Sequence, residues 1–131
     1  MSSPPSLEGR RIVICDYNAL LLSVTGLLRM SGYCVFQAHD GQAADELCRE
    51  LPDIELLVLN TLGTGSDTPS LIRTVRTSHP GLPVLHIGSS VAGLPEDVPT
   101  LPESFSADEL LRAVGALCAG GAKRGLTPYR N

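Results

Sequence analysis

The residues best suited to chemistry lie where short apolar segments of the chain end. Cysteine and serine are nucleophile types, and aspartate is a ligand type for Mg²⁺. In chain order, the residues at these ends are Cys15, Asp16, Asn60, Gly88, Ser89 and Glu103. No histidine or lysine is placed to activate Cys15 or Ser89, so the pattern does not favour an enzyme with a nucleophilic side chain.

The remaining histidines and cysteines do not have the spacing of a metal site. His39, His79 and His86 fall in different segments, and we expect no metal there. The cysteines lack CxxC or CxxH spacing, and each falls in an apolar segment, so we expect small buried thiols in a reducing compartment. They are Cys15, Cys34, Cys48 and Cys118. The Gly-rich loop at 63–66 lacks the lysine of a phosphate-binding loop.

Five short apolar segments alternate with segments of helical period. We expect strands at 11–15, 33–37, 54–59, 84–87 and near 98–101, and helices at 19–30, 42–51, from 68 and from 106. Thr68 can cap the third helix, Ser106 with Glu109 forms a capping box, and the pair Gly120-Gly121 ends the last helix. The span 88–99 is rich in glycine and proline and has no helical period, so we expect the fourth helix to be shortened or absent.

This alternation predicts a flavodoxin-like α/β fold. Its five-stranded parallel sheet would have the order 2-1-3-4-5 with helices on both faces, and such sheets bind ligands outside the carboxyl ends of the strands. We expect one domain at 11–119, a flexible leader at 1–10 and a flexible tail at 120–131.

Composition narrows the class of protein. The 131 residues are 43% hydrophobic and 18% charged, which is typical of a globular domain, and the net charge of -4 disfavours nucleic acid as a partner. No stretch approaches the roughly 20 apolar residues that cross a bilayer, and the first ten residues lack a signal-peptide core. The sequence therefore predicts a cytoplasmic protein without membrane contact.

Three short motifs lie at the expected ends of strands and at the start of the last helix. They are AHDG at 38–41, PVLHIGS at 83–89 and ESFSADELL at 103–111. With these motifs, the order of elements and the sequence distance from Asp16 to Asn60, the chain resembles the receiver domain of two-component response regulators. The resemblance covers 11–119.

The resemblance implies a phosphorylation site, from which this sequence departs. A typical member has two adjacent acids that hold Mg²⁺, an aspartate that takes a phosphoryl group from a histidine kinase, and a Thr or Ser and a Lys that contact the phosphoryl oxygens. The family also has an aromatic switch residue in the fifth strand. At these positions the chain has, in the same order, Cys15 with Asp16, Asn60, Gly88 beside Ser89, Glu103, and finally Thr100.

These departures remove the chemistry. An acyl phosphate needs a carboxylate nucleophile, and Asn60 has a neutral amide. Asp16 alone is a poor Mg²⁺ site, so we expect no cofactor and weak or absent Mg²⁺ binding. Where a lysine would attract a phosphoryl group, Glu103 repels it by about 4 kcal/mol at ~4 Å and an effective dielectric of 20.

Two residues keep more than one interpretation. Asp16 is either a residual metal ligand or, as we favour, a carboxylate that accepts backbone N–H groups at a helix start. Asn60 either mimics a locked on or off state or satisfies hydrogen bonds of its loop, and the sequence does not separate these roles.

We therefore expect a non-enzymatic pseudo-receiver of phosphorelay signalling. It would act by protein–protein interaction, independently of phosphorylation, with a histidine kinase or another signalling protein, or with a second copy of itself. We expect Val91, Leu94 and Val98 to be uncovered beside the last helix and to form the docking surface. An alternative is a flavodoxin-like module that binds a nucleotide or other small molecule.

Overall fold

The computed structural model describes residues 10–15, 22–51, 53–60, 68–89 and 91–122. The strands are β1 Arg11–Cys15, β2 Cys34–Ala38, β3 Ile54–Asn60, β4 Val84–Ile87 and β5 Thr100–Leu101. The helices are α1 Leu22–Met30, α2 Gly41–Glu50, α4 Thr68–Ser78 and α5 Ala107–Ala122. None of the helices in these ranges is long and apolar enough to cross a membrane.

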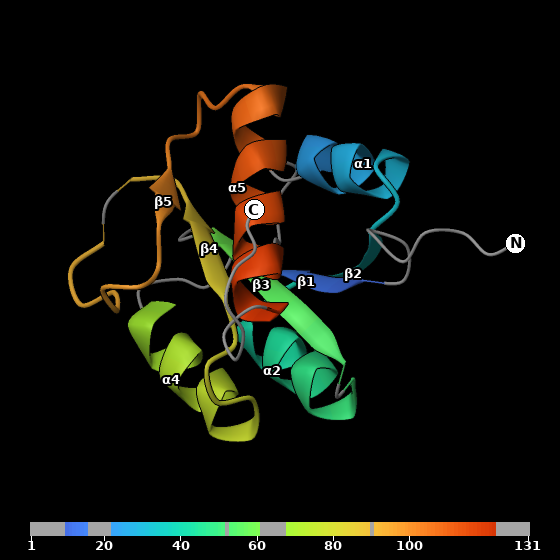
Figure 1. Ribbon diagram of the computed structural model, residues 1–131. Helices are drawn as coiled ribbons and strands as arrows, with labels where there is room; N and C mark the ends of the chain where they lie inside the picture. Colours follow the sequence, from blue (N-terminus) through green and yellow to red (C-terminus); the bar gives the residue numbers. More distant parts are fainter. Residues whose placement is uncertain (1–9, 16–21, 52, 61–67, 90, 123–131) are drawn as a thin grey trace, which may run out of the picture.

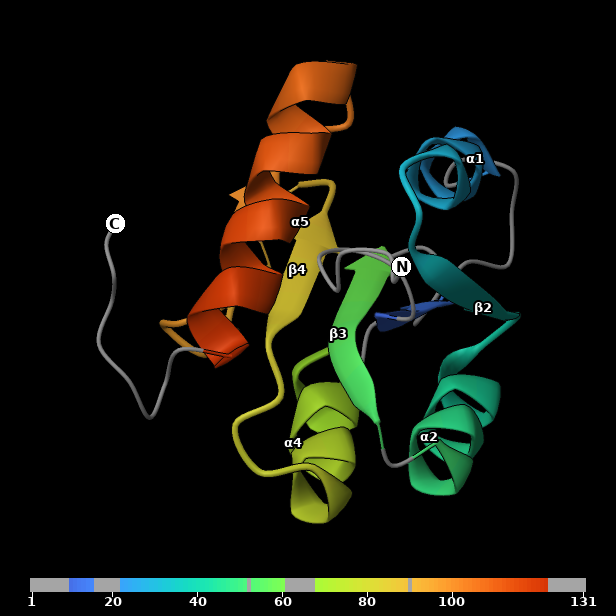
Figure 2. The same cartoon turned by 45° about the vertical axis from the view of Figure 1, so that its right-hand side comes forward.

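The five strands form one parallel sheet in the order β2-β1-β3-β4-β5, which confirms the predicted topology. Helices α1 and α5 cover one face, and α2 and α4 cover the other (Figure 1; Figure 2). All carboxyl ends therefore point to one edge of the sheet. The last residues of β1, β3 and β4 lie at that edge.

Two apolar layers, one on each face, hold the sheet in place. Ile12, Ile14 and Val58 face α1 and α5, whereas Val13, Leu57 and Leu59 face α2 and α4. Because every strand in the middle of the sheet is covered on both faces, its sequence is a continuous apolar run rather than an alternating one. Such runs made β1, β3 and β4 predictable from the sequence.

Local capping signals fix the helix starts. Asp40 Oδ1 accepts the backbone N–H of Ala43 at 2.8 Å at the start of α2. The predicted capping box is present: Ser106 Oγ accepts from Glu109 N at 3.1 Å, and Ser106 N donates to Glu109 Oε1 at 2.9 Å. The predicted end of α5 at Gly120-Gly121 is wrong, because the helix continues to Ala122.

The connection from β4 to β5 has no helix in the residues described, 88–89 and 91–99, as expected. It packs instead against α4. Asp97 receives two bonds from the Arg76 guanidinium, at 2.7 and 3.1 Å, and a Cβ on Gly93 would lie 3.4 Å from Pro69 Cγ. The segment therefore lies on the α4 side of the sheet.

This placement corrects the expected exposure of the segment. Val98 is only 7% exposed and belongs to the core between the sheet and α2 and α4, and Leu94 packs partly buried against the same cluster. The prediction that these side chains lie uncovered beside the last helix is therefore wrong, since the segment takes the place of the missing helix on the other face. Val91 is half-buried. A docking role for Val91 and Leu94 stays a prediction.

One cysteine also departs from expectation. Cys15, Cys48 and Cys118 are buried, but Cys34 is exposed. Cys34 begins β2, an edge strand in which only Val35 and Ala38 are buried, so an apolar neighbourhood in sequence did not place Cys34 in the core. Burial raises the pKa of the Cys48 thiol to about 12, with Asp45 adding to the shift.

Candidate functional site

Three of the predicted site residues meet at the carboxyl edge of the sheet. Asn60 is the last residue of β3, Gly88 follows β4, and Glu103 follows β5. A Cβ atom placed on Gly88 would lie 3.3 Å from Asn60 Nδ2 and 3.8 Å from Glu103 Oε2. The sheet topology therefore gathers three residues that are spread over the chain from position 60 to position 103.

Asn60 is part of the structure of this edge. Its side chain is 1% exposed, and Nδ2 donates to the carbonyl oxygen of Ile87 at 2.8 Å. Asn60 and Ile87 are partners in the register of β3 and β4, so the amide joins the ends of two neighbouring strands. The sequence interpretation assigned the hydrogen bonds of Asn60 to its own loop, whereas this bond goes to a neighbouring strand.

Gly88 adopts a backbone that other residues rarely tolerate. Its φ is +132°, and its N–H donates to Leu101 O at 2.8 Å, which ties the end of β4 to β5. A serine or threonine here would place its Cβ at 3.3 Å from the Asn60 amide as well as straining the backbone. Ser89, the neighbouring hydroxyl residue, is exposed.

The other predicted site residues divide between core, surface and undescribed chain. Cys15 is fully buried and pairs with Leu59 across β1 and β3, so its thiol belongs to the core. Glu103 is exposed, although its Oε2 lies close to Gly88. Asp16 lies outside the described residues. Within the described ranges, no group of three or more His, Cys, Asp or Glu side chains could hold a metal ion.

His86 is the site neighbour that sequence reasoning missed. It lies in β4, is fully buried, and its Nδ1 is 3.2 Å from Oγ1 of Thr100, the residue that the resemblance assigns to the switch position. Burial lowers the pKa of His86. Strand alternation contained the signal, because His86 is two residues before Gly88 and must share its face of the sheet.

The geometry sets limits on the chemistry at this edge. At the end of β3, Asn60 presents a neutral amide that donates to Ile87 O, whereas an acyl phosphate needs a carboxylate nucleophile. The Glu103 carboxylate lies beside Gly88 at the same edge, and its negative charge would repel phosphate. The Asn60 amide can form hydrogen bonds at this edge, but it has no charged oxygen of the kind with which a carboxylate attacks phosphorus.

The chain is similar in sequence to curated response regulators, although no family model matches it. It is 33% identical over 124 residues to response regulator MprA of Mycobacterium tuberculosis (strain ATCC 25177 / H37Ra), and 33% identical over 116 residues to response regulator MprA of Mycobacterium avium (strain 104). Each match covers 82% of this chain and 50% of the relative. The chain thus spans about half the length of the curated relatives it matches.

Solved structures share the fold over most of the chain. The receiver domain of the hybrid histidine kinase CckA matches with a TM-score of 0.70 and 29% identity, over 84% of this chain and 99% of that one. A CheY-like response regulator receiver domain protein from Methanospirillum hungatei JF-1 matches with a TM-score of 0.72 and 16% identity, over 88% and 98%. The chain therefore has the fold of a receiver domain and is similar in sequence to response regulators.

Proposed function

We propose that this receiver domain signals by protein–protein contact without being phosphorylated. The observation that carries the proposal is the buried amide of Asn60, which stands at the phosphoacceptor position and donates to Ile87 O at 2.8 Å. An amide is neutral and, unlike a carboxylate, has no charged oxygen that could attack phosphorus. The domain would then contribute binding rather than catalysis.

The charges around Asn60 support the same conclusion. Glu103 stands where the resemblance leads us to expect a lysine. Its Oε2 would lie 3.8 Å from a Cβ atom placed on Gly88. Cys15 replaces an acid and is buried in the core. With nucleophile, counter-charge and one metal ligand replaced together, we expect Mg²⁺ to bind weakly or not at all.

A second part of the proposal concerns the switch. Gly88 and Thr100 lack the side chains that couple phosphorylation to shape in typical members, and Thr100 is instead within 3.2 Å of His86. A domain without these side chains would present one constant surface. Its partner would be a histidine kinase or another signalling protein, or a second copy of the domain.

The alternative, a nucleotide or small-molecule site at the carboxyl edge, receives less support. That edge has the buried Asn60 and the acidic Glu103, and a phosphate group would be repelled there. The similarities described above are to signalling proteins.

Intact mass spectrometry after treatment with acetyl phosphate and Mg²⁺ tests the proposal. We expect no species heavier by one phosphoryl group, and we expect unchanged affinity for a partner kinase with or without this treatment. A phosphorylated, hydroxylamine-labile species that maps to Asn60 or the loop after it would overturn the proposal. Ser89→Ala serves as the control for labelling of the exposed hydroxyl near the site.

A further inference from the structure

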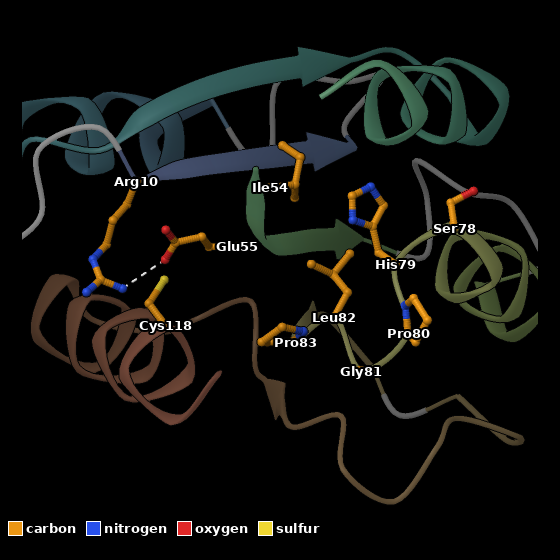
Figure 3. A pocket seen from close by; sticks show the side chains of 10 residues that line it. All are labelled: Arg10, Ile54, Glu55, Ser78, His79, Pro80, Gly81, Leu82, Pro83 and Cys118. Atoms are coloured by element: carbon orange, nitrogen blue, oxygen red, sulfur yellow. Dashed lines mark hydrogen bonds and ion pairs between the residues drawn. The ribbon is translucent and has the colours of Figure 1, made fainter. Parts of the chain in front are cut away.

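A cavity of about 480 Å³ lies at the end of the sheet opposite to Asn60, between β3, the end of α4, the α4–β4 turn and α5 (Figure 3). This volume is in the range of small-molecule sites. Its lining residues are Arg10, Ile54, Glu55, Ser78, His79, Pro80, Gly81, Leu82, Pro83 and Cys118. Nothing in the proposed signalling function uses this cavity.

A bulge in β3 directs a charged side chain to one end of the cavity. Arg11 pairs with Ile54 and Ile12 pairs with Leu56, so Glu55 is the extra residue on β3. Bulges of this kind re-aim one side chain and often lie beside functional sites. The Glu55 carboxylate accepts from Arg10 Nη1 at 2.8 Å, and Figure 3 shows both side chains beside Cys118. The charged end is therefore built by a local irregularity of the sheet.

The opposite rim is a defined turn. Leu82 N donates to His79 O at 3.0 Å, and Gly81 has a φ of +78°, so Pro80-Gly81 occupies the centre of a type II turn. The His79 ring is hydrogen-bonded to Cys48 O of α2. Because both ends are held by hydrogen bonds, the cavity is pre-formed, which lowers the cost of binding a ligand.

The charges at the cavity's polar end cancel. Arg10 and Glu55 carry opposite charges within one ion pair, and their side chains are 26% and 39% exposed. Burial raises the pKa of the Cys118 thiol to about 11, so it is neutral at physiological pH. A single anionic group would meet Glu55, and a single cationic group would meet Arg10. Neutral groups that both donate and accept hydrogen bonds match this pair.

We propose that the cavity binds a small neutral organic molecule with an apolar body and a carboxamide-like polar end. The apolar body would lie against Ile54, Leu82 and Pro83, between the charged end and the turn. The carboxamide would accept from Arg10 and donate to Glu55. This inference goes beyond the proposed signalling function and does not depend on Asn60.

Three nearly isosteric probes test the proposal: benzamide, benzoate and benzamidine, which are neutral, anionic and cationic. Each is titrated into the full chain at pH 8, where an ordinary imidazole is neutral, and backbone amide resonances are followed by NMR. We expect saturable shifts at Glu55, Leu82 and Cys118 with benzamide, and about fivefold or more weaker binding of both charged probes.

The variant Glu55→Gln should make benzoate the tightest-binding of the three probes, because it removes the Glu55 carboxylate that repels an anion and offsets the charge of Arg10. Glu96→Gln, an exposed acid outside the cavity, is the matched control and should keep the wild-type order. Three results would overturn the proposal: no saturable shift at the cavity residues of the wild type, equal binding of the three probes, or an unchanged order in a folded Glu55→Gln variant. The acetyl phosphate experiment is insensitive to each of these outcomes.

Discussion

The Asn60 amide links the ends of two neighbouring strands. Its bond to Ile87 O closes the end of β4, and Gly88 is bound to β5 from the next residue. The sequence could identify Asn60 as unable to accept a phosphoryl group from its chemistry alone. It could not predict the bond to Ile87, because that bond depends on the register of two strands far apart in the chain.

For this reason Asn60→Asp should not restore phosphorylation. The new carboxylate cannot donate to Ile87 O, and loss of that buried bond should lower the free energy of unfolding by about 1–3 kcal/mol. Glu103 would still repel the phosphoryl donor. Chemical denaturation and intact mass spectrometry with acetyl phosphate and Mg²⁺ measure the two effects.

The informative companion is the double variant Asn60→Asp with Glu103→Lys. If Asn60→Asp alone is labelled efficiently and as well as the double variant, Glu103 is not a barrier. Labelling of the double variant only would show that the acidic residue contributes to the loss of activity.

The segment between β4 and β5 has no helix in its described residues, but it still covers part of the sheet. Its residues 91–99 pack on α4, with the Arg76–Asp97 ion pair and the buried Val98 holding them there. The absence of a helix was predictable from glycine and proline content. The face on which the segment lies was not, because a span without a period does not indicate which side is buried.

Val98→Ala should therefore destabilise the domain by about 1–2 kcal/mol, through lost burial and the cavity left behind. Val91→Ala is the matched control, and because Val91 is only half-buried its effect should be smaller. Urea denaturation of both variants gives the comparison. A larger loss for Val91 than for Val98 would contradict the packing described for this segment.

The molecule as a whole was more predictable than its site. Continuous apolar runs identified β1, β3 and β4, and their alternation with helices gave the order of the sheet. Cys34 and the end of α5 were misplaced by the same reasoning, because edge strands and helix ends carry weaker patterns. The cavity beside Glu55 had no sequence signal, since it depends on a bulge.

Stability of the whole domain should depend on pH through His86. Burial lowers its pKa, so the unfolded chain takes up a proton more readily than the folded chain. The free energy of unfolding should fall as pH drops below about 6.5, with a slope of at most about 1.4 kcal/mol per pH unit from this residue, and His86 should add no pH dependence above it. Urea denaturation between pH 5 and pH 8 measures this slope.

His86→Gln should reduce the slope, whatever its effect on stability at neutral pH. His39→Gln is the matched control, because it removes an exposed imidazole and leaves His86 in place. An equal slope in the wild type and His86→Gln would mean that other groups carry the pH dependence.

The short edge strand β5 also affects which edge of the sheet can pair with a strand of another chain. Thr100 and Leu101 are its only residues, and Pro99 and Pro102 flank them without an N–H group to offer an incoming strand. An added strand would find few hydrogen-bonding groups there, so this border resists edge-to-edge aggregation. The opposite border, β2, has five residues without a proline. If the sheets of two copies of this protein pair edge to edge, the pairing is therefore favoured along β2.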